Sequence, residues 1–180
     1  MLDKRVEDCR QKLLECPSWL PDSRRLLLND LSNALYYHFR ELGGIEYLEE
    51  AITYYYRQGF NLWPIGDPNR STALNNLATA VSTRFKQLGQ MEDLEEAITC
   101  HRQALALQPQ GHPDRSSSLN NLAISVSTRF DHLGKLEDLE EAITCHRQAP
   151  ALQPQDHLNR SFSLNNLTSD RQSRTPNWQG

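Results

Sequence analysis

A stretch of 40 residues occurs twice in this chain, 45 positions apart, and this repetition limits what the chain can fold into. Residues 70–109 and 115–154 are identical at 31 of 40 positions. The string Leu-Asn-Asn-Leu begins at positions 74, 119 and 164, so the start of a further copy follows. Because such units pack mainly on their neighbours, we predict a short array of like units.

A more diverged copy precedes these two, at an offset of 46 that falls to 45 from Arg57 onward. One extra residue therefore lies within residues 54–56, where we expect a π-bulge or a shifted register. The array is predicted to span residues 2–168 and to be followed by a disordered tail at 169–180. Its parts are a half repeat at 2–17, repeats at 22–64, 68–109 and 113–154, and a partial repeat at 158–168.

Each repeat is predicted to contain two amphipathic helices, because its apolar residues recur in steps of three and four. In the third repeat, Gly134 separates the two stripes and suits a left-handed helix cap. No segment alternates with period two, so the fold class is all-α, with antiparallel helix pairs. Alanines are expected where the helices approach closely, at positions 78, 97, 104, 123, 142 and 149. The apolar stripes are Leu119, Leu122, Ala123, Val126, Phe130 and Leu133, then Leu136, Leu139, Ala142, Ile143, His146, Ala149 and Leu152.

The spacing of small residues in the second helix, Ala97-x3-His101-x2-Ala104-x4-Pro109, resembles that of the tetratricopeptide repeat. The period of 45 exceeds that family's usual length, and the Leu-Asn-Asn-Leu-Ala start resembles the long repeats of kinesin light chains. The fuller string, which continues with Ser-Thr-Arg-Phe and Glu-Asp-Leu-Glu-Glu-Ala-Ile, looks like arrays in fungal proteins. The resemblance implies a right-handed solenoid that binds proteins. Such arrays often accompany a caspase-like (CHAT) domain or a nucleotide-binding signalling ATPase (NB-ARC), and this sequence has neither.

The composition excludes several classes of function. The net charge is −4 with mixed signs along the chain, which argues against a nucleic-acid partner. No long apolar run predicts a membrane span, and the N-terminus lacks the apolar core of a signal peptide. We therefore expect a cytoplasmic protein with reduced thiols and no membrane contact. The four cysteines include no C-x2-C pair, so we predict no metal site, and nothing in the sequence indicates a cofactor.

Two adjacent pairs, Cys100-His101 and Cys145-His146, suggest a nucleophile and its base. Neighbours on a helix point about 100° apart, so packing of the two histidines is the better interpretation, and we predict no catalytic residue. The paired glutamates at 95–96 and 140–141 suit a solvated helix face or the positive end of a helix dipole better than acid–base catalysis.

A set of polar residues adjoins the core stripe of each first helix. In tetratricopeptide arrays the first helices line the concave groove, so the resemblance implies that this set faces a ligand. An asparagine side chain can both donate to and accept from a peptide backbone, whatever that peptide's side chains are. Interhelical hydrogen bonding between repeats is the alternative for Asn76 and Asn121, and both interpretations stay open. The candidate groove residues are Asn29, Asn33, Tyr37, Asn75, Asn76, Thr79, Thr83, Asn120, Asn121, Ile124 and Thr128.

Cationic side chains are absent from these groove positions, so the family's carboxylate clamp for chaperone tails is not predicted. The helix ends carry the arginines for a cationic rim, which are Arg70, Arg115 and Arg160 with Arg84 and Arg129. The leading function is a non-enzymatic scaffold that binds a peptide or helix in the groove. The alternative is a self-associating regulatory or sensor arm, or a fragment of a larger fungal signalling protein.

The C-terminal repeat is incomplete. We expect Pro150 to kink or end the last helix near Ala149, and a short helix to restart at Arg160 and end near Asp170. Because no second helix follows, the face around Leu139 and Ile143 is expected to be partly exposed. Self-association through this uncapped end is then expected, with tryptic cleavage first at Arg171 or Arg174.

Overall fold

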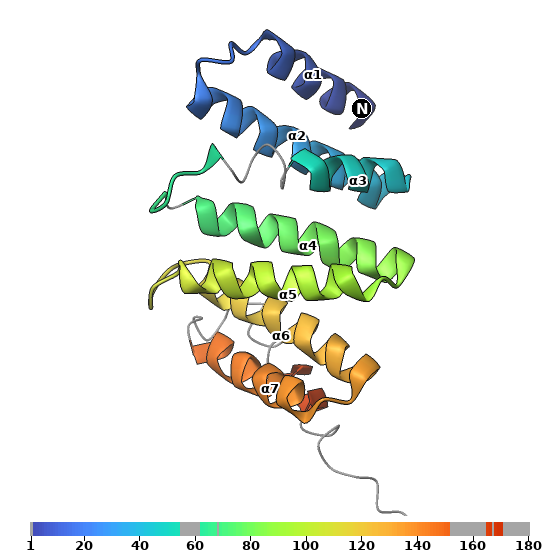
Figure 1. The fold of residues 1–180 in the computed structure, drawn as a ribbon, viewed down its shortest axis with the longest axis vertical. Coiled ribbons are helices and arrows are strands. Elements are labelled where there is room, and N and C mark those ends of the chain that lie inside the picture. The colour runs from blue at the N-terminus through green and yellow to red at the C-terminus, as the bar shows by residue number, and fades with distance from the viewer. Residues whose placement is uncertain (1, 55–61, 68, 152–164, 167, 171–180) are drawn as a thin grey trace, which may run out of the picture. The chain divides into compact units, whose positions relative to one another are not determined.

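The computed structural model describes residues 2–54, 62–67, 69–151, 165–166 and 168–170. These residues form helices joined by short turns, with no strand among them, and the all-α prediction is confirmed (Figure 1). The helices are α1 (Leu2–Glu15), α2 (Pro21–Leu42), α3 (Ile45–Thr53), α4 (Arg70–Leu88), α5 (Met91–Ala106), α6 (Arg115–Leu133) and α7 (Leu136–Ala151).

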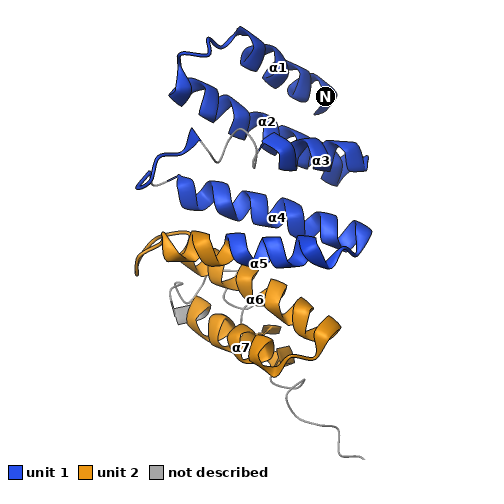
Figure 2. Cartoon of the chain, in the orientation of Figure 1, with its two compact units in different colours: residues 1–100 blue, residues 101–180 orange. Residues whose placement is uncertain are grey.

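The chain divides into two compact units (Figure 2). The first unit, residues 1–100, holds α1 to α4 and the beginning of α5. The second unit, residues 101–180, holds the end of α5 with α6, α7 and the C-terminal helical residues.

Two-residue turns join the helices of each pair and force them to run antiparallel. Gly89 ends α4 and Gly134 ends α6, with φ of +71° and +66° respectively. The amide of Gly89 donates to the carbonyl of Phe85, and that of Gly134 to the carbonyl of Phe130, both at 2.7 Å. The left-handed cap predicted at Gly134 is therefore confirmed, and its counterpart lies at Gly89.

The predicted apolar stripes are buried along most of their described length. In α4 and α6 the leucines and valines as far as Val81 and Val126 are buried, and Phe130 is half-buried. Leu133 at the end of α6 and Leu136 at the start of α7 are exposed, and Leu152 lies outside the described residues. The six alanines at positions 78, 97, 104, 123, 142 and 149 are fully buried, as expected at close helix contacts. In the first unit, one cluster joins α1, α2 and α3 through Val6, Leu13, Leu28, Leu31 and Ala51.

The prediction that Leu139 and Ile143 are partly exposed is wrong. Their side chains are 1% and 4% exposed, and Phe130 of α6 packs against both. The C-terminal helical residues also reach this part of the unit. Asp170 is buried, where Ser127 of α6 donates to it at 2.7 Å and His146 of α7 lies 3.6 Å away.

The chain departs from regular repeats at three places. Tyr54 is π-helical, at the position where the extra residue predicts a π-bulge, and residues 55–61 lie outside the described residues. Helix α7 continues through Pro150 to Ala151, two residues beyond the predicted end near Ala149. Ser169 and Asp170 are helical, so the predicted disordered tail does not begin at 169. The rest of that tail, with the tryptic sites Arg171 and Arg174, lies outside the described residues, as does the helix start at Arg160.

Among the helices that the structure describes, none is both long enough and apolar enough to cross a membrane.

Candidate functional site

Each first helix carries one solvent-accessible line of side chains, spaced four, three and four residues apart, on the side away from the core. We call these lines the α2, α4 and α6 stripes. Their first members are exposed, and the members that follow are half-buried or exposed. The stripes are Leu26, Asp30, Asn33 and Tyr37 on α2, Thr72, Asn76, Thr79 and Thr83 on α4, and Ser117, Asn121, Ile124 and Thr128 on α6.

The threonine hydroxyls of the stripes donate to their own helices. Thr79 donates to the carbonyl of Asn75, Thr83 to that of Thr79 and Thr128 to that of Ile124, each at 2.8 Å. A hydroxyl has one proton, so these side chains retain only acceptor capacity and a methyl group. The donors of the α4 and α6 stripes must therefore come mainly from their asparagine amides.

Two adjacent asparagines in α6 have different environments. Asn120 is 5% exposed, and its Oδ1 lies 3.4 Å from Nδ1 of the buried His146 in α7. Asn121, one residue later, is half-buried in the stripe. Asn120 thus departs from the groove expectation, because its side chain bonds inside the helix pair. Asn75 and Asn29 hold the same repeat position as Asn120 and are half-buried beside their stripes.

The amides of Asn76 and Asn121 are accessible hydrogen-bonding groups within the α4 and α6 stripes. Within the described ranges, neither side chain has a hydrogen-bonding partner. Each offers two N–H donors and one carbonyl acceptor. These are the complementary groups that an extended peptide backbone needs.

A hydrogen bond holds α2 beside α4 in the first unit. The hydroxyl of Tyr36 lies 3.2 Å from Oγ1 of Thr83. Since the Thr83 proton is used in the bond to Thr79, Tyr36 donates in this pair. The ring of Tyr37 meets the ring of Tyr36 edge to face at 6.2 Å and is 47% exposed. The stripes of α2 and α4 therefore belong to one continuous face.

The arginines suggested as a cationic rim are engaged within the fold. Nε and Nη2 of Arg84 donate to the two carboxylate oxygens of Asp93 at 2.9 and 2.6 Å, and Arg129 donates to Asp138 in the same way. At the other ends of the first helices, Arg70 donates to the carbonyl of Trp63. These side chains stabilise the turns between helices. Their charged groups are therefore not available to bind an acidic ligand at the edge of the groove.

Arg115 belongs to the same set, since its Nη1 donates to the carbonyls of Leu105 and Gln108. Cations suit the C-terminal end of a helix, where carbonyls lack partners within the helix, and α5 ends at Ala106. Arg160 lies outside the described residues.

In the first repeat, two stacked aromatic rings replace the Arg–Asp ion pair. The residues at the positions of Arg84 and Asp93 are His38 and Tyr47, and their rings stack with centroids 3.8 Å apart. His38 Nε2 also lies 2.5 Å from a carboxylate oxygen of Asp3 in α1. Sequence reasoning missed this substitution, although an alignment of the repeats places the two rings at the positions of Arg84 and Asp93.

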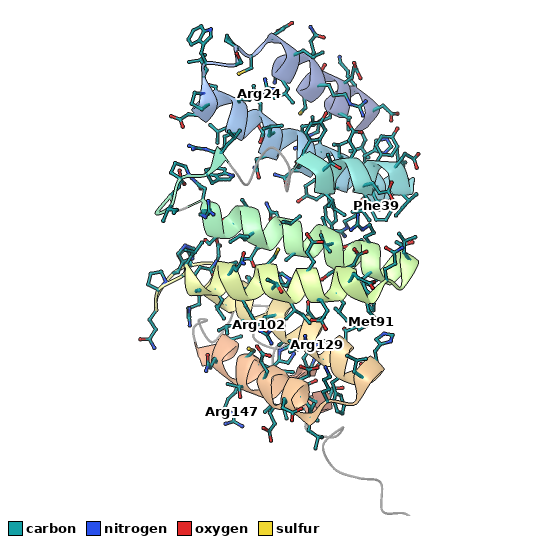
Figure 3. The ribbon with its side chains drawn as sticks, viewed as in Figure 1. Arg24, Phe39, Met91, Arg102, Arg129 and Arg147 are labelled. Atoms are coloured by element: carbon teal, nitrogen blue, oxygen red, sulfur yellow. The ribbon has the colours of Figure 1, made fainter. Side chains whose placement is uncertain are left out.

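The second helices carry ion pairs that link one repeat to the next. Arg10 of α1 contacts Glu50 of α3 at 2.6 Å, and Arg102 of α5 grips Glu141 of α7 with two hydrogen bonds. Figure 3 labels Arg102, Arg129 and Arg147 in the second unit. The pairing gives Glu141 a structural role that needs no acid–base chemistry. The first members of the glutamate pairs, at positions 95 and 140, are exposed, as expected for a solvated face.

The adjacent cysteines and histidines are buried packing residues. Burial raises the pKa of Cys100 and of Cys145 to about 11 and lowers the pKa of His101 to about 4. A nucleophilic thiol needs the opposite shift, toward the thiolate. His101 and His146 are both fully buried, which confirms the packing interpretation. Among the described residues, no group of three potential metal ligands occurs.

Comparison with known proteins agrees with the helical-repeat fold. Residues 70–114 and 115–149 match the family model of the tetratricopeptide repeat. The chain is similar to two crystal structures of nearly identical TPR-like repeats of a putative kinesin light chain from Podosopora anserina. The TM-scores are 0.64 and, for a variant of that protein with one substitution, 0.66, with 20% identity in each case. The matches cover 96% of this chain and 79% and 78% of those chains. No curated protein sequence matches this chain.

Proposed function

We propose that this chain is a protein of tetratricopeptide repeats, which the match of residues 70–114 and 115–149 supports, and that it binds an extended peptide along the stripes of its first helices. The first unit offers a peptide the α2 and α4 stripes, and the second unit separately offers the α6 stripe. Repeats of this type serve as protein-interaction scaffolds, and the proposal assigns the contact surface.

One observation supports this proposal most strongly. Asn76 and Asn121 occupy one repeat position, half-buried, and neither amide has a partner among the described residues. Because both amides are accessible, each can exchange its bonds to water for bonds to the backbone of a ligand. Side-chain amides and methyl groups on the stripes would contact the backbone of a peptide more than its side chains, so binding would depend little on the peptide sequence.

The interactions of the arginines support a ligand that is not acidic. Arg84 and Arg129 are held by buried aspartates, and Arg70 and Arg115 by backbone carbonyls. A clamp for a C-terminal carboxylate would require free cations beside the asparagines. The described stripes contain none.

Self-association remains a second candidate function, but the surface expected for it is not available. Leu139 and Ile143, the residues predicted to be exposed at the C-terminal end, are buried. Light scattering over a hundredfold concentration range measures the mass directly. A mass that does not change with concentration leaves peptide binding as the function to be tested.

The proposal is tested by a peptide-display selection on the full chain and on three variants. Asn76→Ala and Asn121→Ala each remove one stripe amide, and Gln148→Ala removes an exposed amide from α7 as the matched control. Selected peptides, measured by fluorescence anisotropy, should bind about 5- to 10-fold more weakly to the variant of the unit that they occupy, as expected for one or two lost hydrogen bonds. That variant is Asn76→Ala for the first unit and Asn121→Ala for the second. Equal affinity for all four proteins would show that the stripes are not the binding surface.

A further inference from the structure

The α2 stripe differs from the other two stripes in charge and in ring content. By repeat register, Asp30 holds the position of Asn76 and Asn121, and Tyr37 that of Thr83 and Thr128. Asp30 is exposed, and almost half of the Tyr37 side chain is accessible. A carboxylate and an aromatic ring therefore replace an amide and a methyl group on the same line.

Asp30 keeps its charge available for a ligand. No hydrogen bond or ion pair joins its side chain to another residue in the described part of the chain. The negative charge of Asp30 also acts on Cys9 in α1. Burial raises the pKa of the Cys9 thiol, and the Asp30 carboxylate raises this pKa further. Lys12 and Arg5 of α1 act on that thiol in the opposite direction without forming an ion pair with Asp30.

The two groups are separated by a distance that an extended peptide can match. Asp30 and Tyr37 are seven positions apart on the helix, which is about 10 Å along the axis. Side chains three residues apart in a polyproline-type peptide point the same way and lie about 9 Å apart. Two side chains of one peptide can thus reach both groups at once.

We propose that the α2 stripe makes the first unit selective for basic peptides, in which one lysine or arginine pairs with Asp30 and another, three residues away, stacks on Tyr37. The inference rests on the proposed function, since it names the ligand class of the same face. The neighbouring α4 stripe adds uncharged contacts, and Arg84, which follows its last member, is paired with Asp93. An acidic peptide would be repelled by Asp30 and would find no free arginine on the described stripes.

The experiment uses three fluorescein-labelled peptides of twelve residues in one background of alanine, serine and glutamine. One carries two lysines three residues apart, one carries two glutamates there, and one has neither. We expect the lysine peptide to bind about 5- to 10-fold more tightly than the uncharged one, from one exposed ion pair and one cation–π contact. Added salt should remove most of this difference, because exposed charges are screened.

The chain itself supplies the matched variants. Asp30→Asn and Tyr37→Thr install the residues that the second repeat has at these positions, and each should lower the lysine preference about threefold. The double change Asn121→Asp with Thr128→Tyr should raise the affinity of the α6 stripe for the same peptide. Melting curves of all variants confirm that they fold.

The outcomes separate the inference from the function on which it rests. If the three peptides bind equally and Asp30→Asn changes nothing, the selectivity is wrong while peptide binding stands. If none of the peptides binds, both the selectivity and the proposed function are overturned.

Discussion

Arg129 at the end of α6 and Asp138 in the first turn of α7 form a two-point ion pair that closes their turn. Nε and Nη2 of the arginine donate to the two carboxylate oxygens at 2.9 and 2.5 Å. Both side chains are largely shielded from water. The same ion pair joins Arg84 to Asp93 in the preceding repeat, so the interaction is a feature of the repeat and is not confined to one site.

Removing one partner of this pair should destabilise the protein strongly. Arg129→Ala leaves the buried carboxylate of Asp138 without its counter-charge, and a loss of about 3 kcal/mol in the free energy of unfolding is expected. The matched control is Arg102→Ala, whose pair with Glu141 is more exposed and should contribute less than about 1 kcal/mol. Urea unfolding measures both, and equal losses would contradict the distinction.

A core substitution tests the predicted packing of the first helix. Leu122 is buried in α6, so Leu122→Ala should lower the free energy of unfolding by about 2–5 kcal/mol. Leu133 lies on the same helix and is exposed, so Leu133→Ala should change it by less than about 0.5 kcal/mol. A small effect at Leu122 would show that this stripe does not form the core.

The two adjacent asparagines of α6 should respond differently to alanine. Asn120→Ala leaves Nδ1 of the buried His146 without its partner, and a loss of about 1–3 kcal/mol is expected. Asn121→Ala removes an accessible amide, and a change below about 0.5 kcal/mol is expected. Thermal melts of the two variants check this without a ligand. A large loss for Asn121→Ala would favour the interhelical ladder over ligand contact.

Acid should destabilise the fold through His101. Burial lowers the native pKa of His101 to about 4, whereas an unfolded histidine titrates near its ordinary value of about 6.5. Between these values the unfolded state binds more protons, so stability falls as the pH drops through this window, by about 3 kcal/mol in total. His101→Phe removes the group, and its melting temperature should fall less between pH 7 and pH 4.5. Parallel curves for the two proteins would rule out this contribution.

Much of the fold could be predicted because it depends on periodicity and on repetition. Apolar residues that recur every three or four positions identify the buried face of α6. The duplicated sequence shows that α4 has the same buried face. The alanines follow from the same register. These are properties of one helix and its neighbours, which a sequence displays directly.

The features that sequence reasoning missed depend on contacts between segments that are far apart. Helical spacing does not predict that Asn120 bonds to His146 while Asn121 stays accessible. The two asparagines are adjacent in sequence, and both lie beside the core stripe of α6. The burial of Leu139 depends on Phe130 of another helix. Composition favours an unstructured C-terminal segment, whereas Asp170 has partners on both α6 and α7.

The side-chain amide resonances of Asn76 and Asn121 provide the most direct test of peptide binding on the stripes. A titration of the 15N-labelled protein with a selected peptide, followed by NMR, should shift the amide pair of each stripe that the peptide occupies in step with saturation. The amides of Gln103 and Gln148 on the second helices should not move. Saturable binding that leaves the resonances of Asn76 and Asn121 unchanged would contradict the account.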